Sequence, residues 1–122
     1  MTVKEAIKFL SDFEILSEED FMTENIYLGD QDYSVINTIK RHPDFNEDFI
    51  KCYDLIKDGK IVDSYGGEGK GDNYYKIWYF PSQEVYLKFD GYYNSYDGAQ
   101  FTGTYEVLPK EKTITVYEYI NR

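Results

Sequence analysis

The sequence has little of what catalysis and metal binding usually require. Among 122 residues there is one cysteine, Cys52, and one histidine, His42, so neither an internal disulfide nor a cysteine metal site can form. His42 precedes Pro43 and has no nucleophile motif or metal-ligand company at a recognisable spacing, so we expect a surface turn residue rather than a catalytic base. We expect Cys52, which has no flanking signature, to pack in the core.

Long apolar runs are also missing. The longest clear one spans residues 77–80, far short of the roughly 20 residues that a membrane-spanning helix needs. Glu5 stands where a secretory signal would be apolar. We therefore expect a cytoplasmic protein that is not an enzyme, inserts into no membrane and carries no cofactor.

Positive charge is absent from one long stretch. Between Lys8 and Lys40 there is no lysine or arginine, although eight carboxylates fall there, and we call residues 9–39 the acidic segment. Such a field repels nucleic acid and attracts basic protein surfaces. The carboxylates either form a solvated face that keeps the protein soluble, or stand in for phosphates on the basic groove of a nucleic-acid-binding protein.

What the chain does have is enough apolar surface for an ordered domain. Hydrophobic residues make up 42% and aromatic residues 19%, which is sufficient for folding despite the net charge of -10. The length is near the commonest domain size, and no repeat or linker divides the chain, so we expect one domain over residues 1–122.

The first half of the sequence predicts helices. Thr2 and Glu5 form a capping box before an apolar stripe, which predicts a helix over residues 3–13. Ser17 and Asp20 resemble a second start, and a short apolar stripe at residues 35–39 predicts a helix that stops near Pro43. Residues 44–57 fit a helix better than a strand. The alternative is a hairpin through residues 58–59 that pairs residues 50–56 with 61–65.

The second half predicts β-structure from residue 61 onward. Residues 74–80, 85–93 and 113–120 are rich in β-branched and aromatic side chains, and residues 81–83 supply a turn. The expected fold is α+β, with the N-terminal helices packed on one face of a twisted antiparallel sheet of about four strands. One sheet face should be apolar and the other lined by tyrosines. The residues expected in the core, against the first helix, are Ile77, Leu87, Phe89, Ile114 and Val116.

The candidate partner-binding residues are acidic or aromatic. The aromatic ones lie in the turn-rich tract 90–98, whose tyrosines suit a protein-binding loop, although a twisted strand end with a turn at residues 97–98 explains the tract as well. An EF-hand is excluded, because Val35 stands where that loop needs glycine and Arg41 where it needs glutamate. The candidates are Asp12, Glu14, Glu18, Glu19, Asp20, Glu24, Asp30, Asp32, Tyr92, Tyr93 and Tyr96.

A glycine-rich stretch at residues 66–71 supports an alternative hypothesis. Flexible glycines can aim backbone N–H groups at a phosphate, and Lys70, Lys76 and nearby tyrosines can add charge and stacking. The spacing is not that of a P-loop, and a mobile connection or wide bulge between Tyr65 and Tyr74 is the alternative interpretation of the stretch. For a small-ligand binder, such as a sponge for a nucleotide signal, the candidates are Gly67, Gly69, Lys70 and Tyr74.

The second half of the sequence carries five short patterns, which are GGEGxGDxYY at residues 66–75, VY at 85–86, GxYxSYxG at 91–98, VxPK at 107–110 and TVYE at 115–118. Together they resemble a group of small phage-encoded proteins without an established activity. The resemblance covers about half of the chain and implies a viral accessory gene, whose products often look like defence inhibitors such as anti-CRISPR proteins. The acidic segment lies outside it. The leading hypothesis is therefore an inhibitor that blocks the nucleic-acid groove of a CRISPR effector or another nuclease in the host bacterial cytosol.

Overall fold

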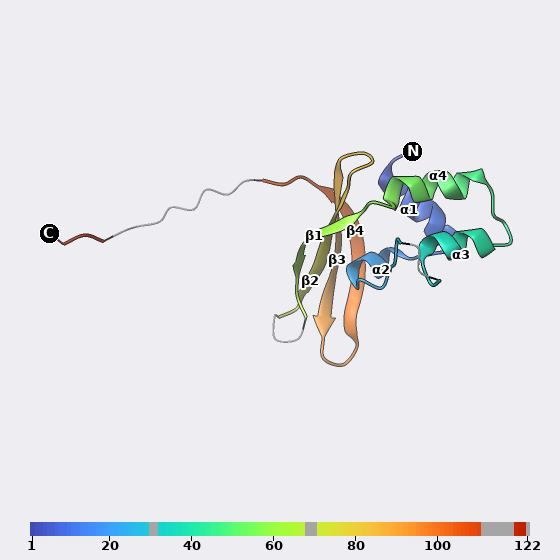
Figure 1. The fold of residues 1–122 in the computed structure, drawn as a ribbon. Coiled ribbons are helices and arrows are strands. Elements are labelled where there is room, and N and C mark those ends of the chain that lie inside the picture. Colours follow the sequence, from blue (N-terminus) through green and yellow to red (C-terminus); the bar gives the residue numbers. More distant parts are fainter. Residues whose placement is uncertain (30–31, 68–70, 111–118, 122) are drawn as a thin grey trace.

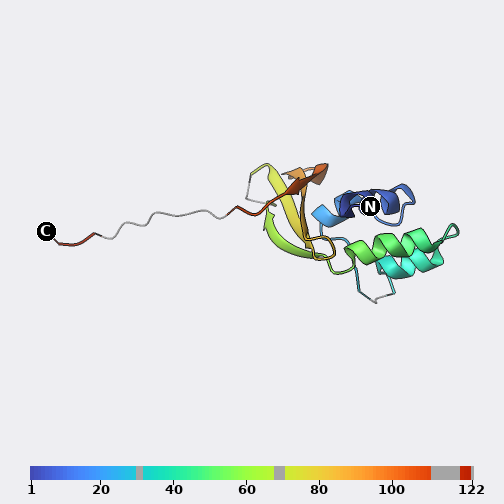
Figure 2. The same cartoon turned by 90° about the horizontal axis from the view of Figure 1, so that it is seen from above.

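The computed structural model of the chain describes residues 1–29, 32–67, 71–110 and 119–121. Four helices precede four strands in this part of the chain, and the strands form one antiparallel sheet in the order β1-β2-β3-β4. Figures 1 and 2 show all the helices on one side of the sheet, so the predicted α+β architecture is confirmed. The elements are α1 (Val3–Asp12), α2 (Glu18–Met22), α3 (Val35–Arg41), α4 (Glu47–Ile56), β1 (Lys60–Tyr65), β2 (Asn73–Phe80), β3 (Val85–Asn94) and β4 (Gly98–Val107).

The first two helices start at capping boxes, as predicted. Thr2 Oγ1 accepts from Glu5 N at 3.0 Å, and Glu5 Oε1 accepts from Thr2 N at 3.0 Å. These bonds to Thr2 hold the pKa of the Glu5 carboxyl below its ordinary value. Ser17 and Asp20 make the same reciprocal pair at the start of α2. Local side-chain chemistry therefore fixes where both helices begin.

Helix α4 resolves the ambiguous segment 44–57. Asn46 caps it by accepting from Asp48 N, and Phe49, Cys52 and Ile56 are buried at helical spacing. Helix α1 packs along α4. The hairpin alternative is wrong for residues 50–56, because one face of a helix buries all three apolar side chains whereas a strand would split them between two faces.

The sheet has an inner face toward the helices and an outer face away from them. Leu87 and Phe89 lie on the inner face and are buried, as predicted. In β2 the inner side chains are Lys76, Trp78 and Phe80, so the prediction that Ile77 is buried there is wrong. Ile77 is half-buried on the outer face. Because side chains alternate along β2, either Ile77 or the rings of Trp78 and Phe80 can face the helices. The two rings bury more apolar area than one isoleucine does, so they take the inner face.

The predicted strand over residues 113–120 can be compared with the structure only in part. Residues 113–118 of the predicted strand 113–120, including Ile114 and Val116, lie outside the described residues. Strand β4 was not predicted. It pairs with β3 along its whole length, with an irregularity opposite residues 90–91. The tract 90–98 combines the end of β3 with the turn into β4.

Helix α2 packs across the inner face of the sheet. The prediction that the first helix would cover this face is therefore wrong. The buried Phe21 ring stacks on Phe89, with centroids 4.8 Å apart, and contacts Trp78 edge-on at 5.2 Å. Trp78 Nε1 donates to Phe21 O at 2.8 Å. Gly91 allows this close approach, because a Cβ there would lie 2.6 Å from Met22 Sδ. Helix α1 meets the sheet at its start, where Val3 N donates to the side chain of Gln83, in the β2–β3 turn.

We expect Trp78→Phe to lower the free energy of unfolding by about 1–3 kcal/mol, because it leaves the buried Phe21 carbonyl without its donor. Tyr79→Phe is the matched control, since Tyr79 is half-buried on the outer face of the same strand, and we expect it to change little. Urea unfolding followed by far-ultraviolet circular dichroism measures both. Equal effects of the two substitutions would contradict this account of the docking of α2.

Candidate functional site

The acidic segment is distributed over three places in the fold. Asp12 and Glu14 lie at the end of α1, Glu18, Glu19 and Asp20 form the first turn of α2, and Glu24 and Asp32 lie between α2 and α3. Asp30 lies outside the described residues. The carboxylates of α2 also have a local role, because negative charge at a helix N-terminus is favourable.

Three of these carboxylates have partners within the chain, although the sequence suggested that no cation was close to any of them. Asp12 pairs with Lys8 one helical turn earlier, at 3.6 Å between Oδ1 and Nζ. Asp20 is held by Ser17 in the capping box. Glu24 lies 4.0 Å from the ammonium of Lys76 on β2. These three are therefore part of the structure of the domain itself.

The other four carboxylates have no ion pair in the ranges that the structure covers. Glu14, Glu19 and Asp32 are exposed and Glu18 is half-buried. Glu14 has a positive φ of 60°, which directs the chain from α1 toward α2. These four side chains, which we call the unpaired carboxylates, are the part of the acidic segment that is available to a partner.

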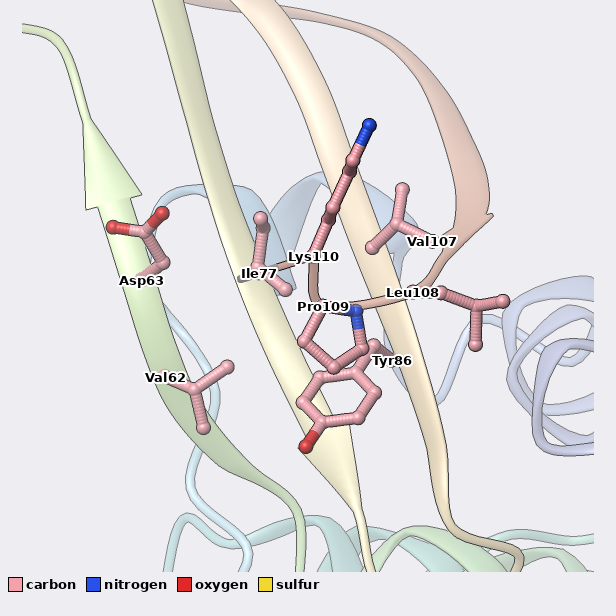
Figure 3. A pocket seen from close by; sticks show the side chains of 8 residues that line it. All are labelled: Val62, Asp63, Ile77, Tyr86, Val107, Leu108, Pro109 and Lys110. Atoms are coloured by element: carbon pink, nitrogen blue, oxygen red, sulfur yellow. The ribbon is translucent and has the colours of Figure 1, made fainter. Parts of the chain in front are cut away.

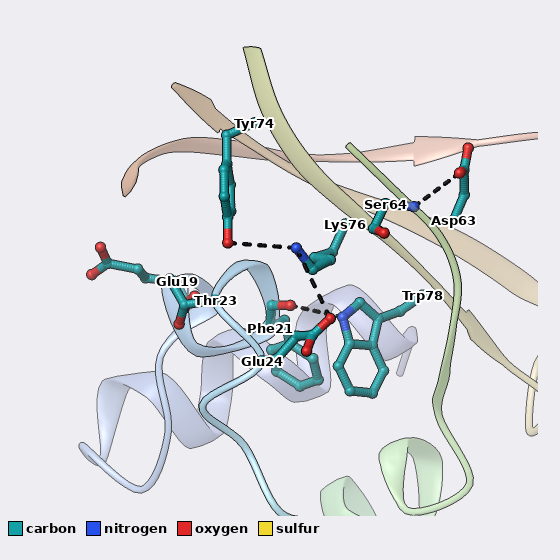
Figure 4. Close-up of polar contacts among 9 residues, drawn as sticks. All are labelled: Glu19, Phe21, Thr23, Glu24, Asp63, Ser64, Tyr74, Lys76 and Trp78. Carbon is teal, nitrogen blue, oxygen red and sulfur yellow. Dashed lines mark hydrogen bonds and ion pairs between the residues drawn. The ribbon is translucent and has the colours of Figure 1, made fainter. Parts of the chain in front are cut away.

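Lys76 connects the acidic segment to the tyrosines of the sheet. Its side chain points to the inner face and is almost completely buried, with 7% of the residue exposed. The ammonium lies 3.5 Å from Tyr74 Oη, 4.5 Å from the centre of the Tyr74 ring and 4.0 Å from Glu24 Oε1 (Figure 4). Tyr93 stacks on Tyr74 with centroids 6.3 Å apart. The cluster brings Glu24, Tyr74 and Tyr93 together. No pattern in the sequence predicted that these three residues lie close to one another.

The remaining predicted tyrosines lie apart from this cluster. Tyr92 is on the outer face, and Tyr96 lies in the β3–β4 turn with 97% of its surface exposed. Among the alternative ligand-binding residues, Gly67 has φ of 117°, whereas Gly69 and Lys70 lie outside the described residues. Of the two lysines suggested for the ligand site, Lys76 already has a counter-charge within the chain, because Glu24 lies beside its ammonium.

Sequence reasoning missed an exposed aromatic pair inside the acidic segment. The Tyr27 and Tyr33 rings contact edge-to-face, with centroids 4.6 Å apart, and are 45% and 66% exposed. Ile26 and Leu28 on either side of Tyr27 pack against the core. This alternation of apolar and tyrosine side chains at residues 26–28 was the available signal, because it turns Tyr27 outward while its neighbours turn inward.

The outer face of the sheet carries tyrosines and a groove. The ring of Tyr75 lies under the Lys88 ammonium at 4.5 Å, and burial, with the nearby Asp63 carboxylate, raises the pKa of its phenol. The groove has a volume of about 500 Å³ and continues past β4 to Leu108 and Pro109 (Figure 3). Its other lining residues are Val62, Asp63, Ile77, Tyr86, Val107 and Lys110.

His42 and Cys52 both have structural surroundings. His42 is half-buried between the Phe13 and Phe49 rings, so the expectation of a surface histidine was wrong. Its Nδ1 accepts from Asp44 N at 3.0 Å, and Nε2 lies 3.2 Å from Phe13 O, which fits a proton on Nε2. Cys52 is buried in the core, as predicted, and burial raises the pKa of its thiol.

The described residues contain no group of three or more histidine, cysteine, aspartate or glutamate side chains that could hold a metal ion. They also contain no helix with both the length and the apolar character needed to cross a bilayer.

The pairing of Glu24 with the buried Lys76 gives a prediction about stability. We expect Glu24→Gln to lower the free energy of unfolding, because it leaves a buried ammonium without its counter-charge. In a Lys76→Met background the same substitution should have no effect. Urea unfolding of the two single variants and the double variant measures the coupling. An equal loss in both backgrounds would show that Glu24 acts independently of Lys76.

Comparisons of the chain with protein-family models, with curated proteins and with solved structures found no match. The resemblance to small phage-encoded proteins therefore stays a prediction.

Proposed function

We propose that the protein is a non-enzymatic inhibitor whose acidic segment occupies the basic nucleic-acid-binding groove of a partner protein. In this proposal the unpaired carboxylates take the place of phosphates. The partner is a CRISPR effector or another nuclease, and the gene belongs to a phage that uses the product against host defence. The observation that carries the proposal is a contrast among the described carboxylates of the acidic segment: three have an ion pair or a capping hydrogen bond within the chain, and the four unpaired carboxylates have neither.

The physical support is electrostatic. Exposed carboxylates that lack internal partners keep their field in solution, and such a field steers a basic surface toward them. The net charge of -10 disfavours direct binding to nucleic acid. Helix α2 is fixed to the sheet by Phe21 and Trp78, so Glu18 and Glu19 are presented from a rigid element. A preorganised surface loses less conformational entropy when it binds than a disordered acidic tail does.

Neutralising the unpaired carboxylates should abolish capture of the partner. The variant combines Glu14→Asn, Glu18→Gln, Glu19→Gln and Asp32→Asn; asparagine suits the positive φ at residue 14. Tagged protein is used to capture partners from a lysate of the host bacterium, and the captured protein is tested for DNA binding. We expect wild-type protein to capture a DNA-binding protein and the variant to capture at least tenfold less, because several aligned charges act together on association.

The matched control neutralises four other carboxylates and changes the net charge equally. It combines Asp44→Asn, Glu47→Gln, Asp58→Asn and Glu84→Asn. Glu47 begins α4 as Glu18 begins α2, and Glu84 has a positive φ like Glu14. Both variants should melt close to wild type. Equal capture by the two variants would show that the acidic segment contributes only net charge and solubility.

A small-ligand binder is the second candidate, and the outer groove is the observation that favours it. The volume of about 500 Å³ lies within the usual range for ligand pockets, and the lining is mostly apolar. This location differs from the glycine-rich stretch that the sequence suggested. Recovery of a stoichiometric small molecule with the purified protein, and its loss in Tyr86→Ala, would favour this candidate over the inhibitor.

A further inference from the structure

The tyrosines of this protein differ in whether a cation of the chain covers their rings. Three sheet tyrosines each have a lysine ammonium over the ring: Lys76 over Tyr74 at 4.5 Å, Lys88 over Tyr75 at 4.5 Å and Lys60 over Tyr79 at 5.9 Å. Such contacts are favourable because the face of an aromatic ring is negative. Tyr27 and Tyr33 have no such contact among the described residues, and the sequence has no lysine or arginine between Lys8 and Lys40.

Hydrogen bonds and burial hold the described backbone next to each tyrosine of the pair. Val35 N donates to Tyr27 O at 2.9 Å, which ties Tyr27 to the start of α3. Tyr53 Oη, from α4, donates to Leu28 O at 2.7 Å. Ser34, which follows Tyr33, is completely buried. A partner that binds the exposed Tyr27 ring therefore meets a backbone already fixed to α3 and α4, so it has little conformational entropy to remove there.

The geometry of the pair leaves ring surface open. The interplanar angle is 83°, so the edge of one ring meets the face of the other. The ring that presents its edge has both of its own faces outside this contact. Asp32, one of the unpaired carboxylates, precedes Tyr33 in a segment that has no lysine or arginine. An exposed aromatic ring in an acidic segment matches an arginine side chain, whose guanidinium stacks on rings and pairs with carboxylates.

We propose that Tyr27 and Tyr33 are the anchor for an arginine side chain of the basic partner protein. The inference rests on the proposed function and makes it more specific, because it names the partner group that is recognised. The unpaired carboxylates act on the association rate and its salt dependence, whereas the aromatic pair acts on the lifetime of the complex. A buried stacking contact is less sensitive to ionic strength than an exposed charge pair.

A fluorescein-labelled nona-arginine peptide is the probe, and fluorescence anisotropy at low and at physiological ionic strength is the measurement. We expect Tyr27→Ala/Tyr33→Ala to weaken binding about fivefold at both ionic strengths and to leave the salt dependence unchanged. Tyr27→Phe/Tyr33→Phe keeps both rings and should bind like wild type. Tyr105→Ala, at an exposed tyrosine of β4 that belongs to no candidate site, is the control and should also bind like wild type.

The outcomes separate the anchor from the proposed function. If the alanine pair binds like wild type while neutralisation of the unpaired carboxylates weakens binding, the anchor is wrong and the acidic inhibitor stands. If Tyr105→Ala weakens binding as much as the alanine pair does, the contact is unspecific stacking and the anchor is again wrong. Failure of wild-type protein to bind the peptide at low ionic strength would overturn both proposals.

Discussion

The packing of α2 on the inner face of the sheet is the interaction on which the rest of the structure depends. A helix of five residues is not stable by itself, so tertiary contacts must hold it. Phe21 supplies them through its contacts with Phe89 and Trp78 and through the hydrogen bond from the indole to its carbonyl. The ion pair between Glu24 and Lys76 fixes the chain that follows. Without this docking Glu18, Glu19 and Glu24 would have no fixed position relative to the sheet.

Local rules predicted the helices well because α1, α2 and α4 each start at a side-chain cap, although Ser34 makes no such bond at the start of α3. The capping boxes at Thr2 and Ser17 placed two starts, and the spacing of Phe49, Cys52 and Ile56 favoured the helix that is observed. The strands were harder to predict. Residues 74–80 are apolar on both faces, so alternation could not show that Lys76 points inward. Strand β4 has few apolar residues and becomes a strand by pairing with β3.

The sequence predicted which residues belong to the candidate site but not how they are arranged in space. The run of carboxylates in the acidic segment was visible in the sequence, but its division into paired and unpaired side chains depends on contacts with residues as distant as Lys76. The aromatic pair depends on the burial of Ile26 and Leu28, which only the core determines. In the proposed complex the unpaired carboxylates attract the basic groove of the partner. Tyr27 and Tyr33 then bind one arginine of that groove.

Competition between this protein and DNA for the captured partner is the most direct test of the account. A short fluorescent duplex is bound to the partner, and this protein is added while the anisotropy of the duplex is followed. Mimicry of nucleic-acid charge predicts that the duplex is displaced completely, and that the amount of protein required rises in proportion to the duplex present. A ternary complex, in which partner, duplex and this protein are bound at the same time, would contradict the central claim.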